Sequence, residues 1–152
     1  MRKLFAAALV AASLAACTSS APCDDAGCPN IGGYYTASWD LDAGTLEKTG
    51  DGGVCTWVIF SGWSLTQTGS ALALESGLLP MTGTLYSNNT VALTGEAGGL
   101  NASMSGSVTP GATDGDGGVL SPASMRGQLV SNSIDADGNT CLSIVAFEAT
   151  QL

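Results

Sequence analysis

The segment Leu100-Asn-Ala-Ser-Met-Ser-Gly-Ser-Val-Thr109 decides the fold, because it alternates with a period of two. Apolar or small residues occupy positions 100, 102, 104, 106 and 108, and Asn, Ser or Thr occupies every position between them. This alternation is typical of a strand with one face in a core and the other in water. No window of 12 residues after Cys17 carries a helical stripe, so the sequence predicts an all-β fold.

Similar alternation along the rest of the chain predicts about eight strands, separated by turn-forming residues. They span residues 33–41, 55–68, 71–78, 80–87, 90–97, 100–109, 124–131 and 141–151. The regular spacing of successive strands favours an antiparallel up-and-down meander. Eight strands allow such a meander to close into a small barrel whose interior holds side chains or one small ligand. An open β-sandwich is the alternative.

A weak internal repeat, apolar-x-Gly-x-x, marks several of these strands. Its glycines are Gly83, Gly95, Gly106 and Gly127. Each glycine falls in phase with the apolar positions, so we expect it to face inward and to permit a bend or close packing in a curved sheet. The pentapeptide Gly-Asp-Gly-Gly-Val occurs at residues 50–54 and 115–119 and predicts two exposed hairpin loops.

The N-terminus has the three parts of a secretory signal. Met1-Arg2-Lys3 is basic, residues 4–12 are apolar, and small residues lead to Cys17. The apolar run is far shorter than the roughly 20 residues that a membrane-spanning helix needs. An export signal is therefore predicted.

The sequence Leu14-Ala15-Ala16-Cys17 resembles the lipobox of bacterial lipoproteins. The resemblance implies that the thiol of Cys17 receives a diacylglycerol and that cleavage follows Ala16. In Gram-negative members, an Asp after the Cys retains the protein in the inner membrane. Here Thr18 follows, which implies an outer-membrane location. Membership of the bacterial lipoproteins would make residues 1–16 a signal peptide, residues 17–31 a lipidated cysteine with a flexible tether, and residues 32–152 the β domain.

Charge and composition exclude several kinds of function. The 152 residues are 45% hydrophobic, enough for one domain with a core. Loss of the leader leaves Lys48 and Arg126 as the basic side chains against 13 acidic ones, so nucleic acid is not an expected partner. Histidine is absent, which removes Ser-His and Cys-His catalysis.

Four cysteines besides Cys17 predict two disulfides in an oxidising compartment. We favour Cys23 with Cys28, which lie close in sequence, and Cys55 with Cys141. If Cys55 and Cys141 began strands on either side of the first strand, about 9.6 Å would separate them, too far for a disulfide. The second bridge therefore needs Cys55 on a loop. A zinc site is the rival interpretation, but the two Cys pairs lack matching spacings.

The remaining segment, from residue 32 onward, resembles small bacterial lipocalin-like and avidin-like meanders. The resemblance rests on Gly62-Trp-Ser-Leu-Thr-Gln-Thr-Gly69 and Met81-Thr-Gly-Thr-Leu85, which match the family pattern Leu-Thr-Gln-x-Gly followed by x-Gly-Thr. It implies a meander barrel. The ligand-contacting positions of these families have no match here, so the resemblance assigns no binding residue.

Carboxylates offer two further hypotheses, neither of which we favour. Residues 135–139 and 114–116 place Asp residues two apart beside Gly, as calcium loops do, but no Glu closes either loop. Glu75, Glu96 and Glu148 are candidates for glycoside hydrolysis by a carboxylate pair. We expect no enzymatic activity, no metal and no cofactor.

The tryptophans are the candidate ligand contacts. Trp39 shares its phase with core positions, whereas Trp57 and Trp63 lie in a run that is apolar on both faces. The sequence thus supports a lipid-anchored envelope protein with a non-catalytic interaction or structural role, whose partners are the membrane and possible envelope proteins. The alternative is a binder of a small hydrophobic or sugar ligand inside the barrel, contacted by Trp57 and Trp63. A filled interior would favour the first hypothesis.

Overall fold

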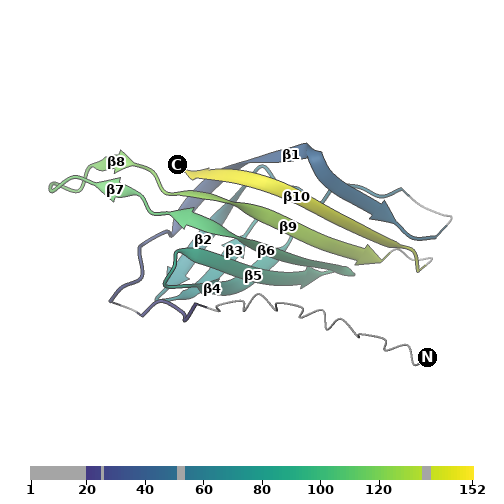
Figure 1. Cartoon of the computed structure of the whole chain (residues 1–152), viewed down its shortest axis with the longest axis horizontal. Coiled ribbons are helices and arrows are strands. Elements are labelled where there is room, and N and C mark those ends of the chain that lie inside the picture. The colour runs from purple at the N-terminus through teal and green to yellow at the C-terminus, as the bar shows by residue number, and fades with distance from the viewer. Residues whose placement is uncertain (1–19, 25, 51–53, 135–137) are drawn as a thin grey trace, which may run out of the picture.

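The fold is all-β, as predicted, in a computed structural model that describes residues 20–24, 26–50, 54–134 and 138–152. Eight strands form a closed antiparallel barrel in the order β1-β10-β9-β6-β5-β4-β3-β2 (Figure 1). The closed barrel rules out the open sandwich. The barrel strands are β1 (Gly33–Lys48), β2 (Gly62–Thr68), β3 (Ala71–Glu75), β4 (Pro80–Leu85), β5 (Thr90–Ala97), β6 (Leu100–Thr109), β9 (Ser124–Ile134) and β10 (Thr140–Gln151).

The alternation that predicted the strands separates a dry interior from a wet wall. In β6, Ala102, Met104 and Val108 are buried, and the Ser and Asn residues between them are exposed. All eight barrel strands contribute buried side chains to one core cluster. The two buried polar side chains, Ser131 and Ser143, face each other with their hydroxyl oxygens 2.7 Å apart, so each has a hydrogen-bond partner.

Two segments differ from the predicted strands. Residues 54–61 are not a strand, although the prediction began one at residue 55. This segment lies beside the second half of β1, and only its end joins the sheet, where Ala37 N donates to the Ser61 carbonyl oxygen at 2.9 Å. Phe60 is buried and Trp57 and Val58 pack against the core, whereas Val54 and Ile59 are exposed, so the apolar run does not mark a strand that is buried on both faces.

A small hairpin, β7 (Ala112–Thr113) with β8 (Val119–Ser121), was not predicted because its strands are too short to show a period. It projects beyond the end of the barrel at which the C-terminus lies (Figure 1). The pentapeptide at residues 115–119 lies at its turn, which confirms that loop prediction. Of the other copy, residues 51–53 fall outside the described residues.

The repeat glycines allow neighbouring strands to approach closely, as predicted. Gly106 in β6 lies directly opposite Gly127 in β9. A Cβ at Gly106 would collide with the carbonyl oxygen of Arg126, and a Cβ at Gly127 would collide with that of Ser105. At Gly83 it would collide with the backbone of β5. These contacts involve backbone atoms, so side-chain movement cannot relieve them.

The variant Gly106→Ala is therefore expected to lower the free energy of unfolding by about 1–3 kcal/mol, the usual cost of overpacking. Gly115→Ala is the matched control, because nothing lies within 4 Å of the Cβ it would add. Urea unfolding followed by tryptophan fluorescence measures both. Equal stability of the two variants would contradict close packing at the Gly106–Gly127 pair.

Candidate functional site

The predicted lipidation residue, Cys17, lies outside the described residues. The chain that follows it packs against one end of the barrel. Cys23 N donates to the Leu85 carbonyl oxygen at 3.1 Å, and Ser87 N donates to the Ala21 carbonyl oxygen at 3.0 Å. Ile31 is fully buried. The barrel end that carries the C-terminus is thus also the end against which residues 21–23 pack.

Both predicted disulfides are present. Cys23 and Cys28 have Cα atoms 5.2 Å apart, and Cys55 and Cys141 have Cα atoms 5.5 Å apart. Because all four sulfurs are in disulfides, none is available as a zinc thiolate. Cys55 lies outside any strand, as the predicted geometry required, at the start of the segment 54–61.

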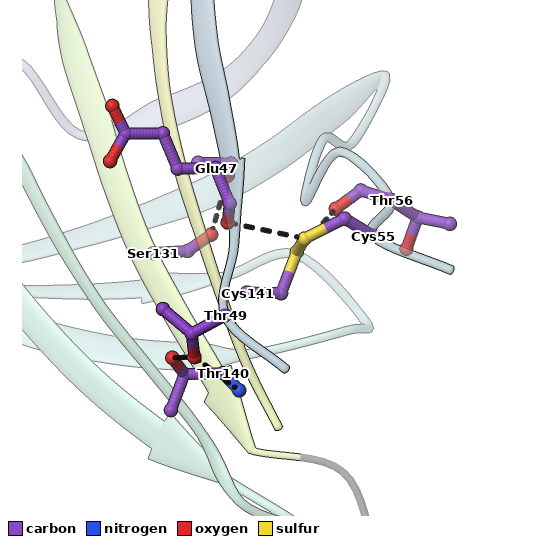
Figure 2. Close-up of a disulfide and its surroundings, with 8 residues drawn as sticks. Glu47, Thr49, Cys55, Thr56, Ser131, Thr140 and Cys141 are labelled. Atoms are coloured by element: carbon purple, nitrogen blue, oxygen red, sulfur yellow. Dashed lines mark hydrogen bonds between the residues drawn. A yellow bond between two sulfur atoms is a disulfide. The ribbon is translucent and has the colours of Figure 1, made fainter. Parts of the chain in front are cut away.

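The long disulfide fixes this segment to the far end of the barrel (Figure 2). The Cys55 sulfur lies 3.4 Å from the Glu47 carbonyl oxygen at the end of β1. Next to it, Thr49 N donates to the Thr140 carbonyl oxygen at 3.0 Å, and the two threonine hydroxyls also bond. The bridge and these bonds join the end of β1, the start of β10 and the segment between β1 and β2.

The candidate tryptophans differ in environment. Trp63 is 1% exposed and packs edge-on against Phe60 and Phe147, with ring centroids 5.5 and 5.7 Å apart. Trp57 is only partly buried and lies outside this ring cluster, over Gly44 of β1. The structure therefore does not join the two indoles in one binding surface.

The same ring cluster contains Trp39 and Tyr35. Trp39 packs against the core, as predicted, and its indole nitrogen donates to the Phe60 carbonyl oxygen at 2.8 Å. Tyr35 stacks on Trp63, and its hydroxyl donates to the Ile31 carbonyl oxygen at 2.7 Å. Among the described residues, the Trp63 indole nitrogen is a buried donor that has no hydrogen-bond partner.

The three candidate catalytic carboxylates, Glu75, Glu96 and Glu148, are exposed on the outer wall, on β3, β5 and β10. Two of them line different hollows in that wall. Glu96 lines a hollow of about 680 Å³, and Glu148 lines another of about 670 Å³. Glu75 lines neither. These hollows do not bring two of the carboxylates together.

The aspartate loops have ordinary turn geometry where they are described. Asp114 uses its carboxylate to accept from the backbone nitrogens of Asp116 and Gly118, at 3.1 and 2.6 Å. Of the second loop, residues 135–137 fall outside the described residues. In the part of the chain that the structure describes, no three His, Cys, Asp or Glu side chains gather as a metal site would require.

The hollow of about 680 Å³ crosses β4, β5, β6 and β9, and we call it the β4–β9 groove. Its polar side chains are Thr82, Thr94, Glu96, Asn101, Ser103 and Asn132. Of this set, sequence reasoning singled out Glu96 alone. Alternation places each residue on the outer wall, but their meeting depends on the cross-strand register, which alternation does not give.

Comparisons with known proteins yield no matching family model, curated protein or solved structure. Within the described residues, no helix has the length and apolar character needed to cross a membrane. The geometry of this chain is therefore the basis for the functional argument.

Loss of the two disulfides is expected to have unequal effects. By the chain-entropy model, the bridge that spans 86 residues contributes about 4.5 kcal/mol and the bridge that spans 5 residues about 2 kcal/mol. The double variant Cys55→Ser/Cys141→Ser should thus lose about twice as much unfolding free energy in urea as Cys23→Ser/Cys28→Ser. A larger loss from the short bridge would contradict the model.

Alkaline pH is expected to weaken the core through Tyr35. Burial raises the pKa of Tyr35 from 10.0 to about 12, so its proton is held more tightly in the folded state. The resulting stability is complete below pH 10 and is lost as the pH rises from 10 to 12. Unfolding free energies measured at pH 9 and pH 12 should fall further in the wild type than in Tyr35→Phe. An equal fall in both would contradict this role for Tyr35.

Proposed function

We propose that the protein is a lipid-anchored component of the cell envelope with a non-catalytic interaction role. The observation that carries the role is the position of the available polar groups. Buried side chains from all eight strands pack together inside the barrel, whereas the polar groups free to meet a partner lie on the outer wall. The carboxylate positions also support a role without catalysis, because Glu96 and Glu148 line different hollows of the outer wall.

The anchor is proposed from the lipobox residues Leu14–Cys17. Two disulfides in an exported chain agree with an oxidising envelope compartment, and Thr18 favours the outer membrane of a Gram-negative cell. With residues 21–23 packed against the barrel, only the few residues after Cys17 would separate the lipid from the folded domain.

A small ligand in the interior is the second candidate. One observation favours it, since the buried indole nitrogen of Trp63 has no acceptor among the described residues. A ligand oxygen at this position would remove the cost of an unpaired buried donor, about 1–3 kcal/mol. The ring packing around Trp63 favours the outer-wall role over this one.

The anchor is tested in a Gram-negative host by labelling with an alkyne-bearing fatty acid, followed by membrane fractionation. Wild-type protein should carry the label and sediment with outer membranes. Cys17→Ser should lose the label and leave the membrane fraction, and Ser19→Ala should behave as wild type. Thr18→Asp should move the labelled protein to the inner membrane. A labelled, membrane-bound Cys17→Ser variant would contradict the anchor.

A further inference from the structure

The β4–β9 groove exists because β4 leaves β5 before β5 ends. The pairing of β4 with β5 covers Thr82 to Leu85, whereas the pairing of β5 with β6 continues to Ala97 and Leu100. From Gly95 onward, β5 therefore has a ladder partner in β6 but none in β4, although Gly95 still lies against Pro80 and Met81. A hollow opens on the outer wall where this pairing ends, next to Pro80 and Gly95. Its volume of about 680 Å³ lies within the range of small-ligand sites, about 300–1,000 Å³.

The groove is lined by polar side chains aligned across strands. Thr82, Thr94 and Ser103 are successive partners in one row, and Glu96, Asn101 and Asn132 form the next row. Within the described chain, none of these six side chains has a hydrogen-bond or ion-pair partner, so their bonding capacity is available to a ligand. Three hydroxyls and two amides supply both donors and acceptors, and one carboxylate adds acceptors.

The lining restricts the chemistry of the ligand. An anionic polymer is disfavoured, because the groove has one charged side chain, Glu96, and that charge is negative. A peptide has little room to bind by strand addition, because the barrel is closed and only the short end of β5 after Thr94 lacks a partner in β4. An aromatic ligand would find no aromatic side chain to stack on, because the apolar surface of the lining comes from Pro80, Ala102 and Val130 and from the threonine methyl groups. An uncharged ligand rich in hydroxyl groups fits all three restrictions.

We propose that the β4–β9 groove binds a neutral oligosaccharide. This inference rests on the proposed function and gives the envelope partner a chemical class. The hydroxyls and amides of the two rows bond to sugar hydroxyls, and Val130 contacts the apolar face of a ring. A second hollow of about 360 Å³ at the β5–β6 turn shares Glu96 and Asn101, so the site suits a chain of several sugars.

The test uses full-length protein purified in a sugar-free detergent, with binding measured by calorimetry. The probes are the neutral tetrasaccharides chitotetraose and maltotetraose, and tetragalacturonic acid serves as the anionic control. At least one neutral probe should bind with a stoichiometry of one, and the anionic probe should bind at least tenfold more weakly. Absence of binding by both neutral probes at millimolar concentration would overturn the proposal.

Two matched pairs of variants place the binding in the groove. Ser103→Tyr fills the groove, whereas Ser105→Tyr adds the same bulk two residues along β6 on the same face. Asn132→Ala removes a groove amide, whereas Gln128→Ala removes an outward amide of β9 that does not line this groove.

Ser103→Tyr should abolish binding, and Asn132→Ala should weaken it by about fivefold, the effect of one hydrogen bond. Both controls should bind as wild type does. Equal losses in groove and control variants would overturn the proposal. Anchoring is scored separately by fatty-acid labelling of the same preparations, so loss of sugar binding with intact labelling contradicts the groove alone.

Discussion

Pairing of the first and last strands of the barrel is the constraint on which the rest of the structure depends. β1 and β10 pair from Tyr35 with Gln151 to Lys48 with Cys141, with one shift of register between Asp40 and Thr45. This contact is the longest in sequence, so its formation carries the largest loop-closure cost. Closure of the sheet gives every barrel strand two neighbours and leaves an inner face that is buried except along the second half of β1, where Leu41 and Leu46 are exposed.

The closed barrel also determines where functional groups can lie. The rings of Tyr35, Trp39, Phe60, Trp63 and Phe147 pack together inside the barrel, which is why we propose the outer wall as the face for partners. Strand pairing in the wall is interrupted at two places. The pairing of β1 with β2 ends at Thr36, and the pairing of β4 with β5 begins only at Thr82. The segment 54–61, held by the long disulfide, fills the first gap, and the second is the polar β4–β9 groove.

The sequence predicted the elements best where burial is one-sided and turns are short. The bounds of β5 and β6 match the predicted residues 90–97 and 100–109, because each strand alternates cleanly and Gly98 and Gly99 form the turn between them. The strand predicted from residue 55 was wrong over the segment 54–61, because the apolar residues there show no period that distinguishes a strand from a loop. The disulfide pairing was predictable because Cys23 and Cys28 lie close enough in sequence to pair with each other, which leaves Cys55 and Cys141 for the second bridge.

The candidate site was less predictable than the fold for a physical reason. Thr82, Thr94 and Ser103 come from three strands, and Asn132 comes from a fourth that follows after an inserted hairpin. Alternation assigns each residue to a face, but only register brings them into the two neighbouring rows of the groove. Similarly, the phase of Trp63 did not reveal that its indole nitrogen would be buried without a partner.

Amide hydrogen exchange along β10, followed by NMR, tests closure most directly. A strand with neighbours on both sides has every amide in a hydrogen bond, whereas an edge strand leaves alternate amides open to water. Because β10 lies between β1 and β9, the successive amides of Ala146, Phe147, Glu148 and Ala149, which have partners in both strands, should all be protected. Fast exchange at alternate positions would mean that β10 is an edge and that the barrel is open.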